Sequence, residues 1–316
     1  MNRFPHLFNP DRPQFHLLLF GIILFSTLSK LILYGLVMTY HPNGIFESSD
    51  STEYQQLALN LFQQGTFSRS PQYPYDPEII RTPAYPLMLA GIYRIFGVHP
   101  ALVVFAQIAL SVATIFISFK IATCLFHKQA GLLTAFLLAA DPVSAYYTQV
   151  ILTETAFTTT LSLCVLLLLY ALKEPSRWQW SVGASLSLAL STYIRPTSYY
   201  LGFLLPFIFF LMIRSATGWR RASIPALAFF TLYGILVGSW QLHNYAQTGS
   251  MEFSQTKNQY LFVAKAAGIV AARDNLDLEE AQRRLATEHY QSIPPALRMA
   301  PPAQLLESQG QYAMNI

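Results

Sequence analysis

Long apolar segments alternate with short polar ones along this chain of 316 residues. The first apolar segment covers residues 15–40 and is interrupted only by Lys30 and a few small polar residues. Six further apolar segments follow, at 101–120, 130–147, 155–172, 180–194, 199–213 and 222–242. Because a helix needs roughly 20 apolar residues to cross a bilayer, the pattern predicts about seven membrane spans. Some of them are close to the lower length limit.

Two polar segments are much longer than the other connections. One is the loop 41–100 after the first span, and the other is the segment 244–316 after the last. We therefore expect a membrane module over 1–243 and a separate segment over 244–316. The chain stops at Ile316 without a recognisable terminal feature, so we also expect it to be a fragment of a longer protein.

The composition indicates a membrane protein. Hydrophobic residues make up 53% of the chain and charged residues 11%, whereas a soluble domain has about 25% charged residues. Together with the helical spans this predicts an all-α polytopic membrane protein, surrounded by membrane lipids and without a nucleic-acid partner.

Positive charge indicates the orientation. With the N-terminus inside, the short inner segments contain nine basic residues: Arg3, Arg12, Lys120, Lys128, Lys173, Arg177, Arg214, Arg220 and Arg221. Lys and Arg concentrate in short loops on the cytoplasmic side of membrane proteins. The two long segments are then expected on the outer face, where loops on a rigid scaffold commonly carry function.

The loop 41–100 contains two patterns of short amphipathic helices. Asp50 and Glu53 suggest an N-cap and the third helical position, and Gly65 suggests the end of that helix. The apolar positions between them recur at helical spacing: Tyr54, Leu57, Ala58, Leu61 and Phe62. A second helix is expected over 85–96. Both are too short to span, so we expect them at the membrane interface.

Asp50 and Arg81 are the candidate chemical groups of this loop. Asp50 could serve only as a helix cap, but a fixed carboxylate at the membrane surface also suits a general base or a metal ligand. Arg81 could simply extend to lipid headgroups. Alternatively its guanidinium, held before the stiff turn Thr82-Pro83-Ala84, could bind a phosphate through paired hydrogen bonds.

Several short motifs occur in a specific order along the chain. They are Asp50-x-x-x-Tyr54, Arg81-Thr-Pro-Ala-Tyr85-Pro, Thr153-Glu154, Ile194-Arg195-Pro196 and Trp240-x-x-His243-Asn244-Tyr245. In this order and at these membrane positions, the chain resembles the C-type (GT-C) glycosyltransferases, which use polyprenyl-phosphate sugars. It is most similar to bacterial relatives of the protein O-mannosyltransferases and of the lipid A aminoarabinose transferases.

The resemblance implies a GT-C-like helical bundle in the bacterial inner membrane. It implies that Asp50 is the catalytic residue and that Arg81 contacts the carrier phosphate. Two positions depart from the family pattern. Ser51 replaces the Glu of an Asp-Glu pair, which argues against protein mannosylation, and His243 replaces an Arg, which argues against a phosphate role there.

Further substrate-binding residues are expected on the same side. Tyr54 and Tyr85 belong to the matching motifs. Glu154, near a span end, suits either a packing hydrogen bond or the active site. Arg195 suits either an interfacial anchor or a second phosphate contact. Three other residues are read as structural: Asp141 as a helix cap before Pro142, Lys30 as facing the bundle, and His243 as interfacial.

The sequence therefore predicts an inverting glycosyltransferase that moves a monosaccharide from a polyprenyl-phosphate carrier to a lipid, glycan or protein acceptor on the outer face. The metal requirement stays open, with Mg²⁺ or Mn²⁺ as the candidate ions and no certain cofactor. Two alternatives remain. A transporter or flippase of lipid-linked sugars would place ionisable residues at mid-membrane, and a non-catalytic envelope assembly subunit would not need Asp50 or Arg81.

Overall fold

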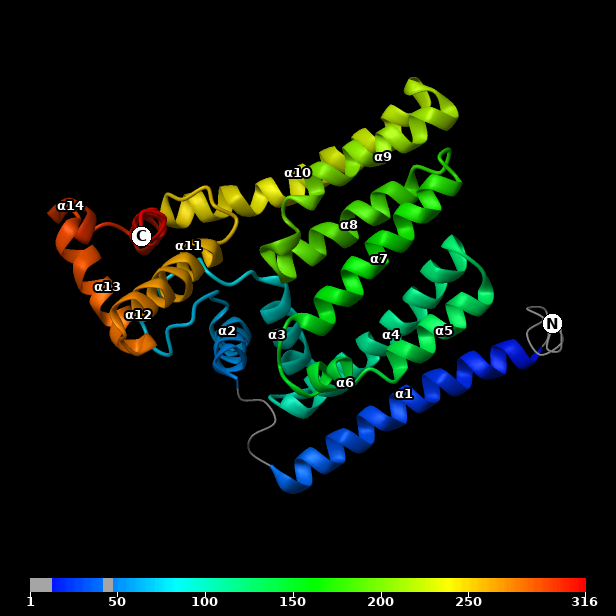
Figure 1. The fold of residues 1–316 in the computed structure, drawn as a ribbon, viewed down its shortest axis with the longest axis horizontal. Helices are drawn as coiled ribbons and strands as arrows, with labels where there is room; N and C mark the ends of the chain where they lie inside the picture. Colours follow the sequence, from blue (N-terminus) through cyan, green and yellow to red (C-terminus); the bar gives the residue numbers. More distant parts are fainter. Residues whose placement is uncertain (1–12, 42–47) are drawn as a thin grey trace. The chain divides into compact units, whose positions relative to one another are not determined.

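The computed structural model describes residues 13–41 and 48–316, and every regular element there is helical (Figure 1). The chain forms two compact units. Unit 1 consists of Met1–Pro71 and Pro83–Gly234, and unit 2 consists of Gln72–Thr82 and Ile235–Ile316. The division falls within the long helix α10 (Trp219–Thr248). The boundary expected after residue 243 lies within the same helix.

Within the described residues, five helical segments are long and apolar enough to cross a membrane. They are formed by α1 (Pro13–Tyr40), α4 (Pro100–Leu125), α7 (Glu154–Lys173), η1 with α9 (Pro196–Ser198 and Leu201–Thr217), and α10. A sixth span is possible as a pair bent by 53°, made of α5 (Lys128–Ala139) and α6 (Pro142–Gln149). The chain is therefore an all-α polytopic membrane protein, as the sequence predicts.

The bend between α5 and α6 has a clear local cause. Asp141 accepts hydrogen bonds from the backbone N–H groups of Val143, at 3.2 Å, and Ser144, at 2.8 Å. Pro142 occupies the first helical position, where its missing N–H costs nothing. This confirms the expected cap at Asp141 and starts a new helix direction inside what the hydrophobic pattern presents as one segment.

The fifth predicted span, 180–194, is where the sequence expectation and the structure differ. These residues form α8 (Gln179–Ile194), which has only 16 residues. At 1.5 Å per residue it is about 24 Å long, less than the roughly 30 Å of a hydrocarbon core. Its buried face is rich in hydroxyl side chains: Ser181, Ser185, Ser187, Ser191 and Thr192. The helix has nearly the predicted bounds, but it is short for a membrane span and its buried face is more polar than that of a typical span.

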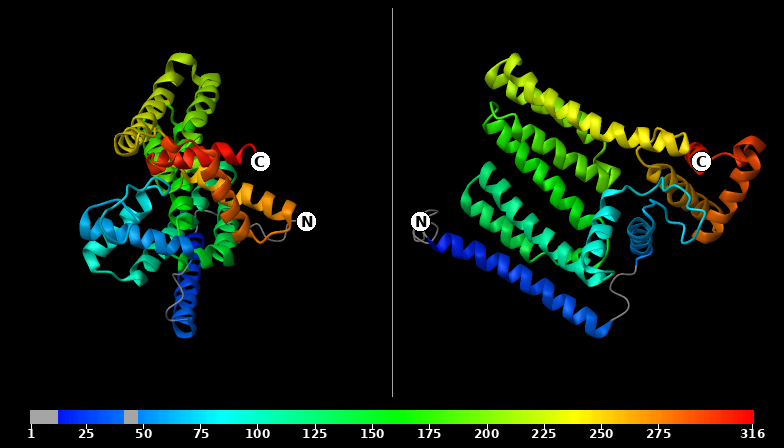
Figure 2. Two further views of the ribbon diagram at one scale, coloured as in Figure 1. Left: turned by 90° about the vertical axis from the view of Figure 1, so that its left-hand side faces the viewer. Right: turned by 180° about the vertical axis from the view of Figure 1, so that it is seen from behind.

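In unit 1, helices that follow one another in the sequence pack as antiparallel neighbours. Figures 1 and 2 show α4 beside α5 and α7 beside α8, and α4 also packs on α7. Hydrogen bonds between helices accompany this packing: Thr114 and Thr159 join α4 to α7 at 2.8 Å, and Ser187 donates from α8 to the Thr160 carbonyl at 2.7 Å. The alternation brings the starts of α4 and α7 and the end of α8 to one end of the bundle.

Two shorter helices pack against that end of unit 1. They are α2 (Ser49–Gln64) and α3 (Ala84–Phe96). Gly65, with φ of +68°, ends α2 in the left-handed region, where glycine is favoured. Tyr54 and Ala58 of α2 are buried in one core cluster with α3, Ile151 and Ile194. The apolar stripe of α2 therefore faces protein.

The first span packs on α6 close to Lys30. Lys30 is fully buried, and its Nζ lies 2.5 Å from Ser26 Oγ on the same helix. The Lys30 backbone carbonyl also accepts a hydrogen bond from Gln149 of α6, at 3.3 Å. The complete burial of the side chain agrees with the expectation that Lys30 faces the bundle, because an ammonium group in contact with lipid is costly.

In unit 2, the loop segment Gln72–Thr82 is hydrogen-bonded to the segment that follows α10. The backbone N–H of Gln255 donates to the Ile79 carbonyl at 2.8 Å, and the hydroxyls of Ser254 and Thr256 donate to the Ile80 carbonyl. Its helical elements after α10 are α11 (Thr256–Tyr260), the π-helical turn η2 (Leu261–Ala266), α12 (Ala267–Asp274), α13 (Leu278–Ser292), α14 (Pro295–Arg298) and α15 (Pro302–Ala313).

A close approach between α9 and α10 generates a stability prediction. A Cβ at Gly202 would overlap the buried ring of Tyr233, whose hydroxyl donates to the Tyr199 carbonyl at 2.8 Å. Overpacking a well-packed core costs about 1–3 kcal/mol, so Gly202→Ala should lower the unfolding temperature of the detergent-solubilised protein. Gly234→Ala is the matched control, because a Cβ there meets open space. Equal unfolding temperatures for the two variants would contradict this packing.

Candidate functional site

The N-cap residue of α2 is not the one that the sequence predicts. Ser48 is the N-cap residue: its Oγ accepts from the Ser51 N–H at 3.1 Å, and Ser51 Oγ accepts from the Ser48 N–H at 3.3 Å. The predicted roles of Asp50 as N-cap and Glu53 as third residue are therefore wrong. Glu53 instead pairs with Arg69 at 3.0 Å. Asp50 lies in the first helical turn and is half-buried, where the positive end of the helix dipole stabilises negative charge.

Two tyrosines connect α2 to α3. The rings of Tyr54 and Tyr85 meet edge to face, with centroids 5.1 Å apart. Tyr85 is fully buried, and its hydroxyl donates to Gln107 Oε1 at 2.7 Å. Burial raises the pKa of Tyr85 well above its usual value, so this hydroxyl stays a neutral donor. Because Asp50 and Tyr54 are four residues apart on one helix, they lie on the same face.

An ion pair joins the start of α7 to the end of α8. Arg195 Nη1 lies 2.6 Å from Glu154 Oε1, and the guanidinium lies over the ring of Phe157 at 5.9 Å. The Arg195 side chain is 36% exposed and that of Glu154 is 28% exposed. Glu154 Oε2 is buried and has no hydrogen-bond partner among the described residues. The pair is thus partly shielded, but the guanidinium still presents donors to solvent.

These contacts place five of the six predicted site residues at one end of unit 1. Tyr54 and Tyr85 share a core cluster with Ala156, two residues after Glu154, and with Ile194, the residue before Arg195. The negative charge of Glu154 also acts on the Tyr85 hydroxyl. Tyr54, Tyr85 and the Glu154–Arg195 pair therefore form one group at the end of the apolar bundle, here called the constellation, and Asp50 lies one turn before Tyr54 on the same helix.

Arg81, the sixth predicted residue, belongs to unit 2. Glu78 Oε1 accepts from the backbone N–H groups of Ile80, at 2.7 Å, and Arg81, at 2.9 Å. Ile79 and Ile80 are buried against Ala303 of α15. The backbone that carries Arg81 is therefore fixed by residues from distant parts of the sequence.

The closing motif of the predicted family pattern has a structural role in unit 2. Trp240 Nε1 donates to the Phe253 carbonyl at 3.2 Å, and the Asn244 amide donates to the carbonyls of Glu252 and Phe253. His243 stacks on Trp240, with ring centroids 4.8 Å apart. These contacts hold the turn after α10, in agreement with a structural reading of His243.

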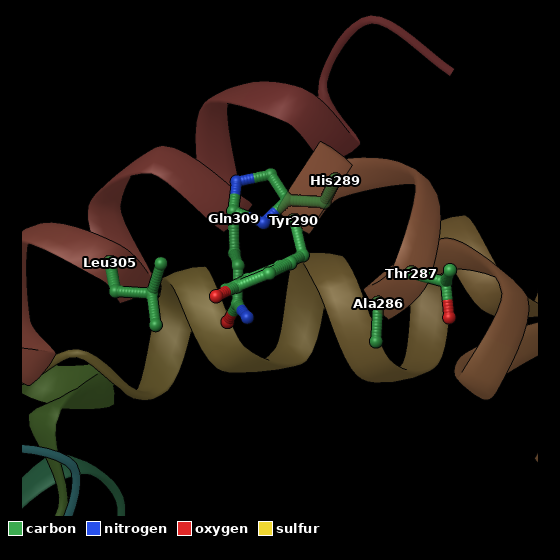
Figure 3. Close-up of a pocket in the computed structure, with 6 residues that line it drawn as sticks. All are labelled: Ala286, Thr287, His289, Tyr290, Leu305 and Gln309. Atoms are coloured by element: carbon green, nitrogen blue, oxygen red, sulfur yellow. The ribbon is translucent and has the colours of Figure 1, made fainter. Parts of the chain in front are cut away.

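Unit 2 also has an open hollow of about 390 Å³ between α13 and α15. Figure 3 shows Tyr290 and Gln309 between Leu305 on one side and Ala286 and Thr287 on the other. His289 Nε2 lies 2.9 Å from Ser308 Oγ, and burial lowers the pKa of His289. A neutral, hydrogen-bonded imidazole is typical of a structural histidine. None of the residues that the sequence marks as candidates lines this hollow.

Metal binding is not assigned to any group of side chains. Among residues 13–41 and 48–316, no three or more His, Cys, Asp or Glu side chains gather closely enough to hold an ion. Asp50 and Glu154 could each contribute one carboxylate ligand.

Sequence reasoning missed Gln107, which the structure places beside the constellation. It is fully buried in α4 and contacts Tyr85 and the connection before Glu154. A signal was present, because an amide within the apolar segment 101–120 must find hydrogen-bond partners.

One comparison with known proteins identifies a family. The model of a family described as dolichyl-phosphate-mannose-protein mannosyltransferase matches residues 80–240, which is half of the chain. The match includes Arg81, Tyr85, Glu154 and Arg195, whereas Asp50 lies before it. No curated protein matches the chain.

The revised cap generates a prediction. Ser48→Ala should destabilise the first turn of α2, because replacing a serine cap by alanine costs about 0.5–2 kcal/mol. Asp50→Ala should cost less, since it removes mainly a dipole interaction of about 0.3–1 kcal/mol. Hydrogen exchange of the α2 amides, followed by mass spectrometry, measures both effects. Faster exchange in Asp50→Ala than in Ser48→Ala would show that Asp50, and not Ser48, is the N-cap residue.

Proposed function

Because the chain belongs to the dolichyl-phosphate-mannose-protein mannosyltransferase family, we propose that it transfers a monosaccharide from a polyprenyl-phosphate carrier to an acceptor of the cell envelope. Family membership and the apolar helices make it a membrane glycosyltransferase with a lipid-linked sugar donor. The observation that carries the finer proposal is the Glu154–Arg195 pair in one constellation with α2, at the end of the bundle. A carrier lipid anchored in the bilayer presents its phosphate at that depth.

Arg195 supplies the phosphate contact in this proposal. One nitrogen of its guanidinium is held by Glu154, and the side chain remains 36% exposed. A guanidinium has five N–H donors in a fixed plane, so donors remain for a phosphate oxygen. Charge-assisted hydrogen bonds of this kind stabilise the negative charge that develops on a departing phosphate. Arg81, in unit 2, is proposed as a further phosphate-binding residue.

Asp50 is proposed as the catalytic residue. The acceptor hydroxyl attacks the anomeric carbon, the bond from that carbon to the phosphate oxygen breaks, and the hydroxyl proton passes to the Asp50 carboxylate. The phosphate leaves with the carrier lipid, so a single displacement inverts the anomeric configuration. Tyr54 and Tyr85, both buried, are proposed to support the substrate site from behind, and Glu154 is proposed to orient Arg195. A bound Mg²⁺ or Mn²⁺ at Asp50 would lower the pKa of the attacking hydroxyl.

We place the reaction on the outer face of the bacterial inner membrane, with a lipid, glycan or protein as acceptor. The basic residues of the short connections, such as Lys173, Arg177 and Arg221, support this orientation under the positive-inside rule. Ser51 has a buried side chain in the α2 capping box, where the mannosyltransferases of the pattern have glutamate. This difference favours an acceptor other than the usual protein hydroxyl.

The test of this function is a carboxylate substitution with a matched control. Purified protein in lipid nanodiscs would be incubated with polyprenyl-phosphate mannose and other polyprenyl-phosphate monosaccharides, together with envelope extract. Asp50→Asn should lower kcat by about 10² to 10⁴, because an amide cannot accept the proton. Glu53→Gln removes another carboxylate from α2 and should stay within a few-fold of wild type. Near-wild-type turnover of Asp50→Asn would falsify the catalytic role.

The orientation has its own test in intact cells. A reporter fused after Gly65 should be active only outside the cytoplasm, and one fused after Pro175 only inside it. Labelling of Ser176→Cys by a membrane-impermeant thiol reagent checks the second site directly. If that cysteine is labelled in unbroken cells, the constellation faces the cytoplasm and the proposed donor side is wrong.

A further inference from the structure

Gln107 connects two parts of the constellation through one fully buried side chain. Its Oε1 accepts a hydrogen bond from the Tyr85 hydroxyl at 2.7 Å. Its Nε2 donates to the backbone carbonyls of Thr148, at 3.1 Å, and Val150, at 2.8 Å. The acceptor and both donors of the amide are therefore used, and the three partners come from α3, from the last turn of α6 and from the connection between α6 and α7.

That connection determines where Glu154 lies. The carbonyl groups at a helix end have no partner within the helix, and Gln107 supplies one for Thr148 and one for Val150. Across the same turn, Thr155 Oγ1 donates to the Tyr147 carbonyl at 3.1 Å. Ile151 and Thr153 are buried between them. The backbone is thus fixed on both sides before α7 begins at Glu154.

We propose that Gln107 is a positioning residue for recognition of the donor phosphate, an inference that rests on the proposed function. It holds the Tyr85 hydroxyl in place and clamps the turn that presents Glu154. Because Glu154 Oε1 lies 2.6 Å from Arg195 Nη1, the hydrogen bonds that fix this turn also fix the position of the Arg195 guanidinium. Loss of the amide leaves a buried phenol and two buried carbonyls without this partner, so the turn and the ion pair shift together.

A purely structural role is the alternative, and the same two helices provide a control for it. Ser111 lies one helical turn beyond Gln107 on α4, and its hydroxyl contacts Ser144 Oγ of α6 at 3.2 Å. This bond also joins α4 to α6 but involves no residue of the constellation. If Gln107 only joins helices, Gln107→Leu and Ser111→Ala should have effects of the same kind.

Steady-state kinetics distinguish the two roles. Misfolding lowers the concentration of active enzyme, which reduces apparent kcat and leaves both KM values unchanged. Positioning predicts that Gln107→Leu raises the donor KM roughly tenfold, the equivalent of one charge-assisted contact, while the acceptor KM changes less than twofold. Ser111→Ala should change neither KM. A lower kcat with an unchanged donor KM in Gln107→Leu would overturn the inference.

Tyr85→Phe covers the case in which Gln107→Leu does not fold. It removes one hydroxyl and leaves both amide bonds to the backbone intact. We expect a smaller rise of the donor KM, about threefold, again without a change in the acceptor KM. An unchanged donor KM in a folded Tyr85→Phe protein counts against the inference.

A second measurement needs no substrate, and so separates this inference from the proposed function. The unfolding-temperature shifts of Gln107→Leu and Glu154→Gln should be non-additive in the double variant, because residues in one network couple. Gln107→Leu with Ser187→Ala should be additive, since Ser187 also joins α8 to α7 but lies off the clamped turn. Additive shifts in both pairs refute the link. If wild-type protein transfers no sugar, the proposed function is refuted. The unfolding temperatures of the single and double variants still test whether Gln107 and Glu154 are coupled.

Discussion

Buried backbone groups must find partners inside the protein, and in an apolar bundle this constraint governs every break in a helix. Lipid offers no hydrogen bonds, so an interrupted span is tolerated only where side chains or neighbouring helices satisfy the freed groups. The segment from α5 to α7 is interrupted twice. Asp141 caps the start of α6, and Gln107 and Thr155 bind carbonyls at its end. The position of Glu154 therefore depends on the hydrogen bonds that satisfy the backbone groups at these two breaks.

Charged side chains of unit 1 also need partners where water is excluded. An unpaired ion in a medium of low dielectric constant is costly, so Arg195 lies against Glu154 at the end of the bundle. Lys30, within α1, is fully buried and has Ser26 as a partner. A transporter typically gathers ionisable groups around a mid-membrane binding site. The Glu154–Arg195 pair instead lies at a helix end, which suits a reaction at the membrane surface.

Local patterns were enough to predict much of the fold. Apolar length located α1, α4 and α7, and Gly65 and Asp141 were read correctly as a helix end and a helix start. The α2 cap was misplaced because Ser48, Asp50 and Ser51 are all good capping residues, and only the reciprocal bonds of two serines decide between them. The bounds of α8 follow the apolar segment closely, but the burial of its hydroxyl side chains depends on neighbouring helices, which the apolar pattern does not report.

The candidate site was predictable to a lesser degree, because its contacts are long-range. Motif order indicated Tyr85, Glu154 and Arg195 as candidates, yet their mutual contacts depend on Gln107, which lies more than 40 residues before the carbonyls it binds. The placement of Arg81 in unit 2 depends on hydrogen bonds between residues 79–80 and 254–256. Pairings over such separations leave no periodic trace in a single sequence.

The distribution of polar groups in unit 1 follows their cost of burial. A neutral amide or hydroxyl can be buried at little net cost once all its hydrogen bonds are made, and Gln107, Thr114 and Thr159 meet that condition inside the bundle. A guanidinium needs a counter-charge and gains from water, so Arg195 lies where a third of its side chain is exposed. Neutral groups therefore join α4 to its neighbours inside the bundle, whereas the Glu154–Arg195 pair lies at its end, where an anionic ligand can reach the guanidinium.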